Sequence, residues 1–161
     1  MGYMHEHKRT TKVSWTRFER DTRRLAAKIG FAAVKPGLIL GINRGGAISA
    51  VLLSHFLGAR DMLTFTIQMT LDNGPNAPRG RPTIVGAEIF PNLAGRCVLL
   101  VDDAVGSGRT YDYARAAIAP FRPRSLYTAA TIWNTEMHKQ CPADFYGGKT
   151  CGWVLFPWER P

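Results

Sequence analysis

Residues 98–110 decide the fold, and they read Val-Leu-Leu-Val-Asp-Asp-Ala-Val-Gly-Ser-Gly-Arg-Thr. The four apolar residues at the start are typical of a parallel strand that is buried on both faces. Two carboxylates, Asp102 and Asp103, follow at the carboxyl end of that strand, and a small-residue loop and a helical run from Thr110 to Ile118 come next. Ligands of open α/β sheets bind at such strand ends, and loop amides with a helix N-terminus bind phosphate. This stretch therefore predicts a binding site.

A second strand, turn and helix precede the first. The apolar run 37–42 predicts a buried strand, Asn43-Arg44-Gly45-Gly46 predicts a tight turn, and residues 47–57 predict a helix that ends at Gly58. Further strands are expected at 62–67, 83–90, 126–133 and 153–156, with a short edge segment at 142–147. Because strands alternate with helices, the sequence predicts an α/β fold with a doubly wound, mostly parallel sheet.

The first expected helix runs from about residue 14 to residue 29. Apolar residues recur there at spacings of three and four, which places Trp15 and Phe18 on the inward face and in the core. Ser14 is a plausible N-cap, and Gly30 is a plausible end.

The length of 161 residues favours one domain, over residues 13–161, preceded by a polar tail over residues 1–12. No apolar run approaches the ~20 residues that span a bilayer. The polar start lacks a signal-peptide core, so we expect a cytoplasmic protein. Three cysteines are an odd number, which favours thiols over disulfides, and Cys141 and Cys151 with His138 fit no standard zinc spacing.

The formal net charge is +9 at pH 7. Such a charge suits nucleic acid, an anionic surface or a polyphosphate substrate. The basic residues are scattered rather than clustered with aromatic residues, which favours small phosphorylated anions over nucleic acid. Residues 71–82 are rich in glycine and proline and form no regular element, so Arg79 and Arg81 could belong to a lid over such an anion or to a plain surface loop.

Two common nucleotide-binding motifs fit the 98–110 stretch poorly. A P-loop needs a lysine where Arg109 stands and a glycine that is missing, and a dinucleotide fingerprint needs a glycine where Tyr111 stands. A ligand with a terminal phosphate, a ribose and a pyrophosphate fits better. Asp102 and Asp103 would accept hydrogen bonds from ribose hydroxyls, directly or through Mg²⁺, and the Arg44-Gly45-Gly46 turn would face the pyrophosphate.

Asp102-Asp103 followed by the loop and Thr110 resembles the signature of type I phosphoribosyltransferases, which use phosphoribosyl pyrophosphate (PRPP). The segments 13–15, 43–46 and 153–159 resemble the xanthine–guanine branch, so the resemblance covers about residues 12–160. It implies the type I fold with a small C-terminal hood, a flexible loop at about 69–82, and a dimer or tetramer.

The resemblance also implies residue roles. Asp102, Asp103 and Arg44 would be catalytic, and the two aspartates would hold Mg²⁺. Substrate binding would fall to Gly45 and Gly46 for pyrophosphate, to Val105, Gly106, Ser107, Gly108, Arg109 and Thr110 for the 5′-phosphate, to Trp153 and Val154 for the base, and to Glu159 for an exocyclic group or a second metal.

Two positions depart from the purine enzymes of the family. Gly106 stands where these enzymes keep an aspartate that faces the base, and Thr135 stands where they keep a lysine. The resemblance implies transfer of phosphoribose from PRPP to a purine-type base, namely guanine, xanthine or hypoxanthine, giving a nucleoside monophosphate and pyrophosphate. Two alternatives stay open: an enzyme for a different or modified base, and a regulator of this fold that binds PRPP, nucleotide or RNA.

Overall fold

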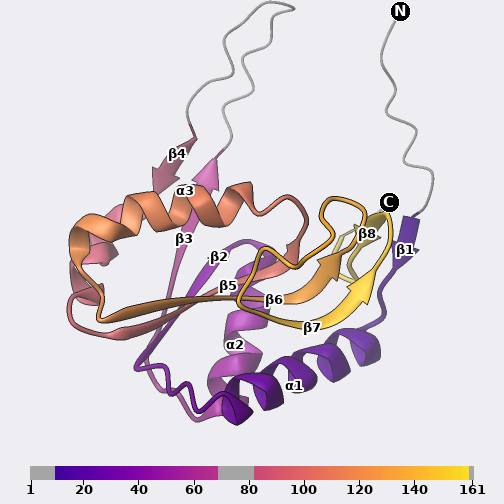
Figure 1. Ribbon diagram of the computed structural model, residues 1–161, viewed down its shortest axis with the longest axis horizontal. Coiled ribbons are helices and arrows are strands. Elements are labelled where there is room, and N and C mark those ends of the chain that lie inside the picture. Colours follow the sequence, from indigo (N-terminus) through magenta and orange to yellow (C-terminus); the bar gives the residue numbers. More distant parts are fainter. Residues whose placement is uncertain (1–9, 69–81, 160–161) are drawn as a thin grey trace, which may run out of the picture.

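The computed structural model describes residues 10–68 and 82–159. Most of the loop expected at 69–82, including Arg79 and Arg81, lies outside the described residues. A six-stranded sheet forms the centre, in the order β4-β3-β2-β5-β6-β7 (Figure 1). Its strands are β2 (Leu38–Asn43), β3 (Met62–Gln68), β4 (Thr83–Val85), β5 (Cys97–Val105), β6 (Ser125–Asn134) and β7 (Phe145–Thr150).

All neighbouring pairs in this sheet are parallel except β3 with β4. Helices α1 (Trp15–Phe31) and α2 (Gly45–Leu57) cover one face, and α3 (Arg109–Ile118) covers the other (Figure 1). Short 3₁₀ segments, η1 (Ala87–Leu93) and η2 (Ala119–Phe121), complete the second layer. The predicted α/β fold with a doubly wound, mostly parallel sheet is confirmed.

Alternating residues of the central strands supply the two cores. Leu100 on β5 packs toward α3, together with Tyr111 and Ile118 of that helix. Leu99 on the same strand packs toward α1 and α2, where Leu25 is also buried. A strand that is apolar on both faces needs helices on both sides, which is why the apolar run 98–101 lies at the centre of the sheet.

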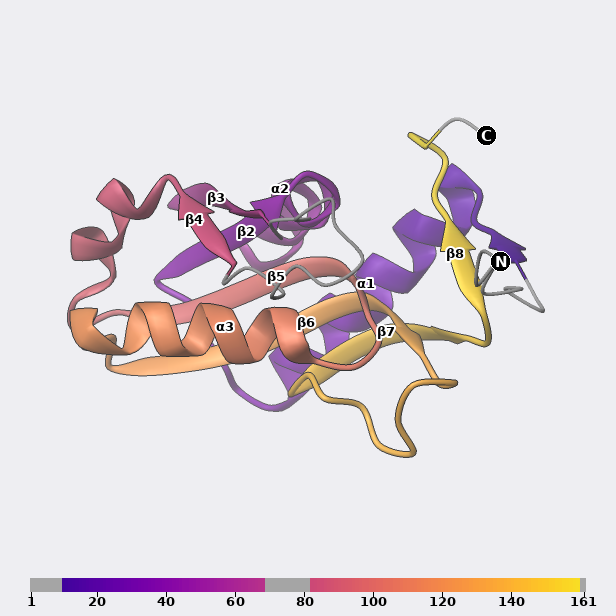
Figure 2. The ribbon, with the colours of Figure 1, turned by 90° about the horizontal axis from the view of Figure 1, so that it is seen from above.

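A small two-stranded sheet stands apart from the main one and forms the C-terminal hood (Figure 2). In it, β1 (Thr10–Lys12) pairs in parallel with β8 (Trp153–Leu155). Residues 10–12, which the sequence assigns to the polar tail, thus form a strand of the hood. A cluster with Val13, Phe18 and Phe156 joins the hood to the main domain.

Three local expectations differ from the structure. Trp15 is 56 % exposed, because it lies in the first turn of α1, where only Phe18 on the inward stripe reaches the core. The strand expected over 83–90 ends at Val85, because Gly86 adopts φ 93° and η1 follows. Helix α1 continues to Phe31 instead of ending before Gly30. Ser14 is the N-cap as predicted, and its hydroxyl accepts a hydrogen bond from Arg17 N.

Within the two described ranges, no helix is long and apolar enough to cross a membrane.

Candidate active site

The turn after β2 lies directly against the acidic pair. A Cβ atom added to Gly45 would lie 1.6 Å from Asp103 Oδ2, and one added to Gly46 would lie 2.6 Å from Val101 O. Only residues without a side chain allow this approach. Asn43 fixes the end of β2, because its Nδ2 donates a hydrogen bond to Thr66 Oγ1 at 3.1 Å. The two glycines of the predicted turn therefore bring the start of α2 onto the end of β5.

The acidic pair itself lies inside β5, which extends to Val105, rather than after the strand as expected. Asp103 N donates to Asp102 Oδ1 at 2.9 Å, and Ala104 N donates to Asp103 Oδ1 at 2.7 Å. These hydrogen bonds hold each carboxylate against the backbone N–H of the next residue in the strand. The geometry places two half-buried acids side by side at the carboxyl edge of the sheet.

Both acids hold their protons more tightly than an ordinary aspartate. Desolvation raises the pKa of Asp102 well above its usual value, and the Asp103 carboxylate raises it further. Desolvation also raises the pKa of Asp103, with a contribution from Glu159. A divalent cation or a pair of hydroxyl donors would relieve this unfavourable charge. Mg²⁺ commonly takes one or two carboxylates together with substrate oxygens and water, so the pair fits such an ion.

No group of three or more metal-ligating residues occurs in the part of the chain that the structure describes. A metal at Asp102 and Asp103 would therefore need oxygen atoms of the substrate to complete its coordination, which is the usual case for Mg²⁺ on phosphorylated ligands.

A cavity of about 840 Å³ opens between the acidic pair and the β2–α2 turn. Six residues predicted for the site line it, namely Arg44, Gly45, Asp102, Asp103, Thr110 and Glu159, together with Ile42, Asn43, Ile67 and Trp158. Trp158 is itself packed against the hood, because its ring stacks on that of Phe156 with the ring centroids 4.6 Å apart. This cavity unites the predicted pyrophosphate and ribose residues.

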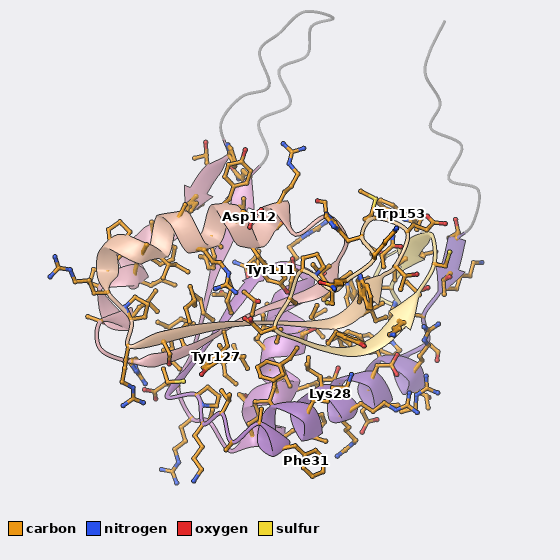
Figure 3. All side chains as sticks on the ribbon, viewed as in Figure 1. Lys28, Phe31, Tyr111, Asp112, Tyr127 and Trp153 are labelled. Atoms are coloured by element: carbon orange, nitrogen blue, oxygen red, sulfur yellow. The ribbon has the colours of Figure 1, made fainter. Side chains whose placement is uncertain are left out.

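A second cavity of about 470 Å³ adjoins the first and shares Asp103 and Glu159 with it. Its other lining residues are Ala104, Val105, Gly106, Ser107, Asn134, Glu136, Met137, Trp153, Val154 and Phe156. Trp153 is 52 % exposed and lies at the hood end of the molecule (Figure 3). The predicted stacking residue and the predicted phosphate loop therefore line one hollow.

The loop before α3 requires glycine at position 108, and the helix that follows it is anchored to the sheet. Gly108 adopts φ 81°, and a Cβ there would lie 2.5 Å from Pro142 Cβ, so glycine is required for both reasons. Tyr111 lies between α3 and the sheet, and its hydroxyl donates to Ala129 O at 2.7 Å (Figure 3). This bond fixes the N-terminal turn of α3, whose amides can receive an anion.

Four predicted site residues line neither cavity. Gly46 and Gly108 shape the backbone instead, and Arg109 lies in the first turn of α3. Thr135 Oγ1 donates to Thr150 O at 3.1 Å, which directs this hydroxyl to the end of β7.

The structure adds residues that the sequence did not single out. Asn134, Glu136 and Met137 line the second cavity. Asn134 is the last residue of β6, the strand next to β5, and the other two follow it. The rule that ligands meet the carboxyl ends of neighbouring parallel strands could have found them.

An open, mostly parallel sheet with polar cavities at its carboxyl edge is typical of α/β proteins that bind phosphorylated ligands. Residues 13–160 match the phosphoribosyl transferase domain family, so the chain belongs to this family. It is accordingly a PRPP-dependent glycosyltransferase.

Two relatives and one solved structure illustrate the likeness. The chain is 26 % identical to a xanthine-guanine phosphoribosyltransferase from a Ruegeria species, over 95 % of this chain and 87 % of the relative. It is 27 % identical to the enzyme of the same name from Cereibacter sphaeroides, over 95 % and 89 %. A purine phosphoribosyltransferase from Pyrococcus horikoshii shares the fold with a TM-score of 0.76 at 24 % identity, over 94 % of this chain and 95 % of that one.

Proposed function

We propose that this chain transfers the 5-phosphoribosyl group of PRPP to a purine base, giving a nucleoside monophosphate and pyrophosphate. The observation that carries the proposal is the pair of adjoining cavities that share Asp103. One has the acidic pair and the glycine turn, and the other has the loop before α3 and an exposed tryptophan. Three relatives bear the name xanthine-guanine phosphoribosyltransferase, which supports a purine.

In this proposal each part of PRPP has its own set of residues. The loop 105–110 and the N-terminus of α3 bind the 5′-phosphate, since aligned amides favour an anion. Asp102 and Asp103 accept the ribose hydroxyls, and the Arg44 turn binds pyrophosphate. Trp153 stacks on the base, and the backbone at Val154 binds its edge.

Bond breaking at C1 of the ribose builds positive charge on the sugar ring, as in glycoside hydrolysis. The Asp103 carboxylate lies between the two cavities, where it would stabilise that charge. Arg44 neutralises the leaving pyrophosphate. Mg²⁺, when bound by Asp102 and Asp103, would supply further charge to the pyrophosphate oxygens.

Pyrophosphate release tests the proposal. The protein is incubated with PRPP, Mg²⁺ and each of adenine, guanine, hypoxanthine and xanthine in turn. We expect release that requires both PRPP and a purine. A regulator of this fold would bind PRPP or nucleotide but release no pyrophosphate with any base. Salt-dependent RNA binding would support this alternative further.

We also propose a homo-oligomer in the cytoplasm. An apolar groove between α1 and α2, with Trp15 and Val51 exposed at its edges, supports a contact between copies. The odd number of cysteines supports a reducing compartment. Light scattering of the purified protein tests the first statement, with a dimer or tetramer expected and a monomer contradicting it.

A further inference from the structure

The connection between β6 and β7 contacts the loop that precedes α3. It covers residues 135–144, all of which the structure describes, and contains no helix or strand. It passes beside the N-terminal end of α3 (Figure 1 and Figure 2). Parallel strands are usually joined by a helix that packs on the sheet. Because a shorter, irregular segment makes this crossover, the segment depends on side-chain contacts to keep a fixed shape.

Two residues of this connection lie directly on the two glycines of the loop. A Cβ atom on Gly106 would lie 3.2 Å from Met137 Cγ, and one on Gly108 would lie 2.5 Å from Pro142 Cβ. Ser107 is the residue between the two glycines. The connection therefore touches the loop on both sides of Ser107, at the two positions where the loop has no side chain to keep a neighbour away.

We infer that the connection 135–144 positions the loop that binds the 5′-phosphate, and that Pro142 is the positioning residue. The inference rests on the proposed function, because it takes the loop 105–110 as the 5′-phosphate site. Pro142 lines neither cavity, so it acts on the ligand through Gly108. Loop amides that are already held in the geometry of the bound anion bind it more tightly than amides that must first be ordered.

Pro142 is better suited to this role than Met137. Pro142 is half-buried, and its ring fixes its own backbone. The next residue, Ala143, is buried in the same core cluster as Val105 and Tyr111. Met137 is 57 % exposed, and its side chain is flexible. A rigid group that is backed by the core can hold a loop in place, whereas a flexible and exposed side chain yields.

Asp144 fixes the end of the connection behind Pro142. Its Oδ2 accepts hydrogen bonds from Thr128 N at 2.7 Å, from Thr128 Oγ1 at 2.8 Å and from Arg115 Nη2 at 2.9 Å. In return, Asp144 N donates to Thr128 Oγ1 at 3.1 Å. Thr128 is fully buried in β6, and Arg115 belongs to α3. One carboxylate thus ties the connection to the strand next to β5 and to the helix that follows the loop.

Thr135 fixes the other end of the connection. Its N–H and its Oγ1 both donate to Thr150 O, at 2.9 and 3.1 Å. Asn134, just before it, donates from Nδ2 to Gly152 O at 2.8 Å. Both ends of the connection are therefore held at β6 and β7, and the exposed residues 138–140 lie between the two contacts with the loop.

The test measures kcat and the KM for PRPP in Pro142→Gly, with guanine at saturation and Mg²⁺ present. The 5′-phosphate is remote from the bond that breaks, so weaker phosphate binding raises the KM for PRPP and leaves kcat unchanged. We expect a rise of about tenfold, the value of one hydrogen bond to a charged group. A variant that merely loses stability would instead lose active enzyme, which lowers kcat and leaves the KM unchanged.

Two further variants keep the test independent of the folding of Pro142→Gly. Pro142→Ala keeps the Cβ that lies nearest to Gly108, so its KM for PRPP should rise, but less than in Pro142→Gly. Asp144→Ala should also raise the KM for PRPP, because it releases the end of the connection. Asp144→Asn should restore the wild-type value, because its amide oxygen still accepts from Thr128 N.

Two inhibitors report on separate parts of the site. Inhibition by ribose 5-phosphate, which carries the 5′-phosphate, should weaken in Pro142→Gly about as much as the KM for PRPP rises. Inhibition by pyrophosphate, which binds at the Arg44 turn under the proposed function, should stay the same. Equal weakening of both inhibitors would overturn the inference, because it would show a disturbance of the whole site.

Pro123→Gly is the matched control, because Pro123 is also half-buried, precedes β6 at its amino end and lines neither cavity. It should leave the KM for PRPP and both inhibition constants unchanged. An unchanged KM for PRPP in Pro142→Gly and Pro142→Ala, with an active wild type, would overturn the role of Pro142 while the proposed function stands. Absence of pyrophosphate release by the wild type with every base would instead overturn the proposed function, and this inference with it.

Discussion

The side chain of Asp103 lies against Gly45 so closely that it fills the space of a side chain there: a Cβ on residue 45 would lie 1.6 Å from Asp103 Oδ2. The glycine belongs to the first turn of α2, and the aspartate belongs to β5. Their close approach joins the two strand, turn and helix units of the chain into one site. It also brings the small-residue turn against the acidic pair, although Gly45 and Asp102 are 57 residues apart in the sequence.

The first prediction concerns Gly45→Ala. The nearest atoms belong to the end of the Asp103 side chain, which can rotate away, so we expect the fold to tolerate the change. Asp103 would then lose its position, and a displacement of about 1 Å can lower kcat/KM by about 10²-fold. Steady-state kinetics with varied PRPP measure this loss.

The control for this variant is Gly30→Ala in α1, where no atom lies within 4 Å of the added Cβ. It should leave kcat/KM unchanged and stabilise the protein by up to about 1 kcal/mol. Full activity of Gly45→Ala would show that Asp103 is not required in its observed position.

The second prediction concerns pH and the acidic pair without metal. The pKa of Asp102 is raised by burial and by Asp103, so the folded protein binds this proton more tightly than the unfolded chain. The free energy of unfolding therefore falls as the pH rises from about 4, the ordinary carboxyl pKa, through the raised pKa of Asp102. Asp102→Asn cannot ionise, so its Tm at pH 7 in chelator should exceed that of the wild type by about 2 °C or more.

Asp112→Asn provides the comparison, because Asp112 is an exposed acid in the first turn of α3. A carboxylate there stabilises a helix, so this variant should lower the Tm slightly. Thermal melts over a series of pH values measure both variants. A lower Tm for Asp102→Asn than for the wild type at pH 7 would mean that the pair is not under electrostatic strain.

The third prediction concerns Trp153. Stacking of a base on an aromatic ring contributes about 1–3 kcal/mol, so Trp153→Ala should raise the KM for the base by about fivefold or more. Trp153→Phe should retain most of the affinity, and the KM for PRPP should stay the same in both variants. Phe31→Ala, at a residue that is 91 % exposed at the end of α1, is the control for loss of an exposed ring. An equal rise in the KM for PRPP would place Trp153 outside the base site.

The fourth prediction concerns the contact of α1 with β7. A Cβ on Gly147 would lie 2.0 Å from Asp21 O and 2.8 Å from Thr131 O, both backbone atoms. Gly147→Ala should therefore destabilise the fold by about 1–3 kcal/mol, since neither atom can move alone. In Gly37→Ala the added Cβ would lie 3.8 Å from its nearest neighbour, Cys97 O, so the free energy of unfolding measured in urea should change little. Equal stability of the two variants would contradict the close packing of α1 on β7.

The order of elements and the acidic pair could be predicted because each depends on local sequence. The apolar run 98–101 required cover on both faces, and the residues after it had to lie at the carboxyl edge. Pairing of residues 10–12 with β8 could not be predicted, because a three-residue strand carries no pattern and depends on a partner 143 residues away.

The cavity beside Trp153 shows the same limit. Thr135 was expected there from its place in the family pattern, but Asn134 at the end of β6, with Glu136 and Met137 after it, lines the cavity instead. Which side of a turn faces a cavity depends on its tertiary contacts, here the bonds of Asn134 to Glu136 N and Gly152 O. No periodicity in the sequence records such contacts.

The central claim is that residues 102–110 form a PRPP site that transfers phosphoribose. The most direct measurement is mass spectrometry of the products formed from PRPP, Mg²⁺ and guanine by the wild type and by the double variant Asp102→Asn, Asp103→Asn. We predict guanosine monophosphate from the wild type, and none above background from a double variant that retains its fold by circular dichroism. Nucleotide formation by the double variant at the wild-type rate would contradict the assignment of the acidic pair and, with it, the account of the site.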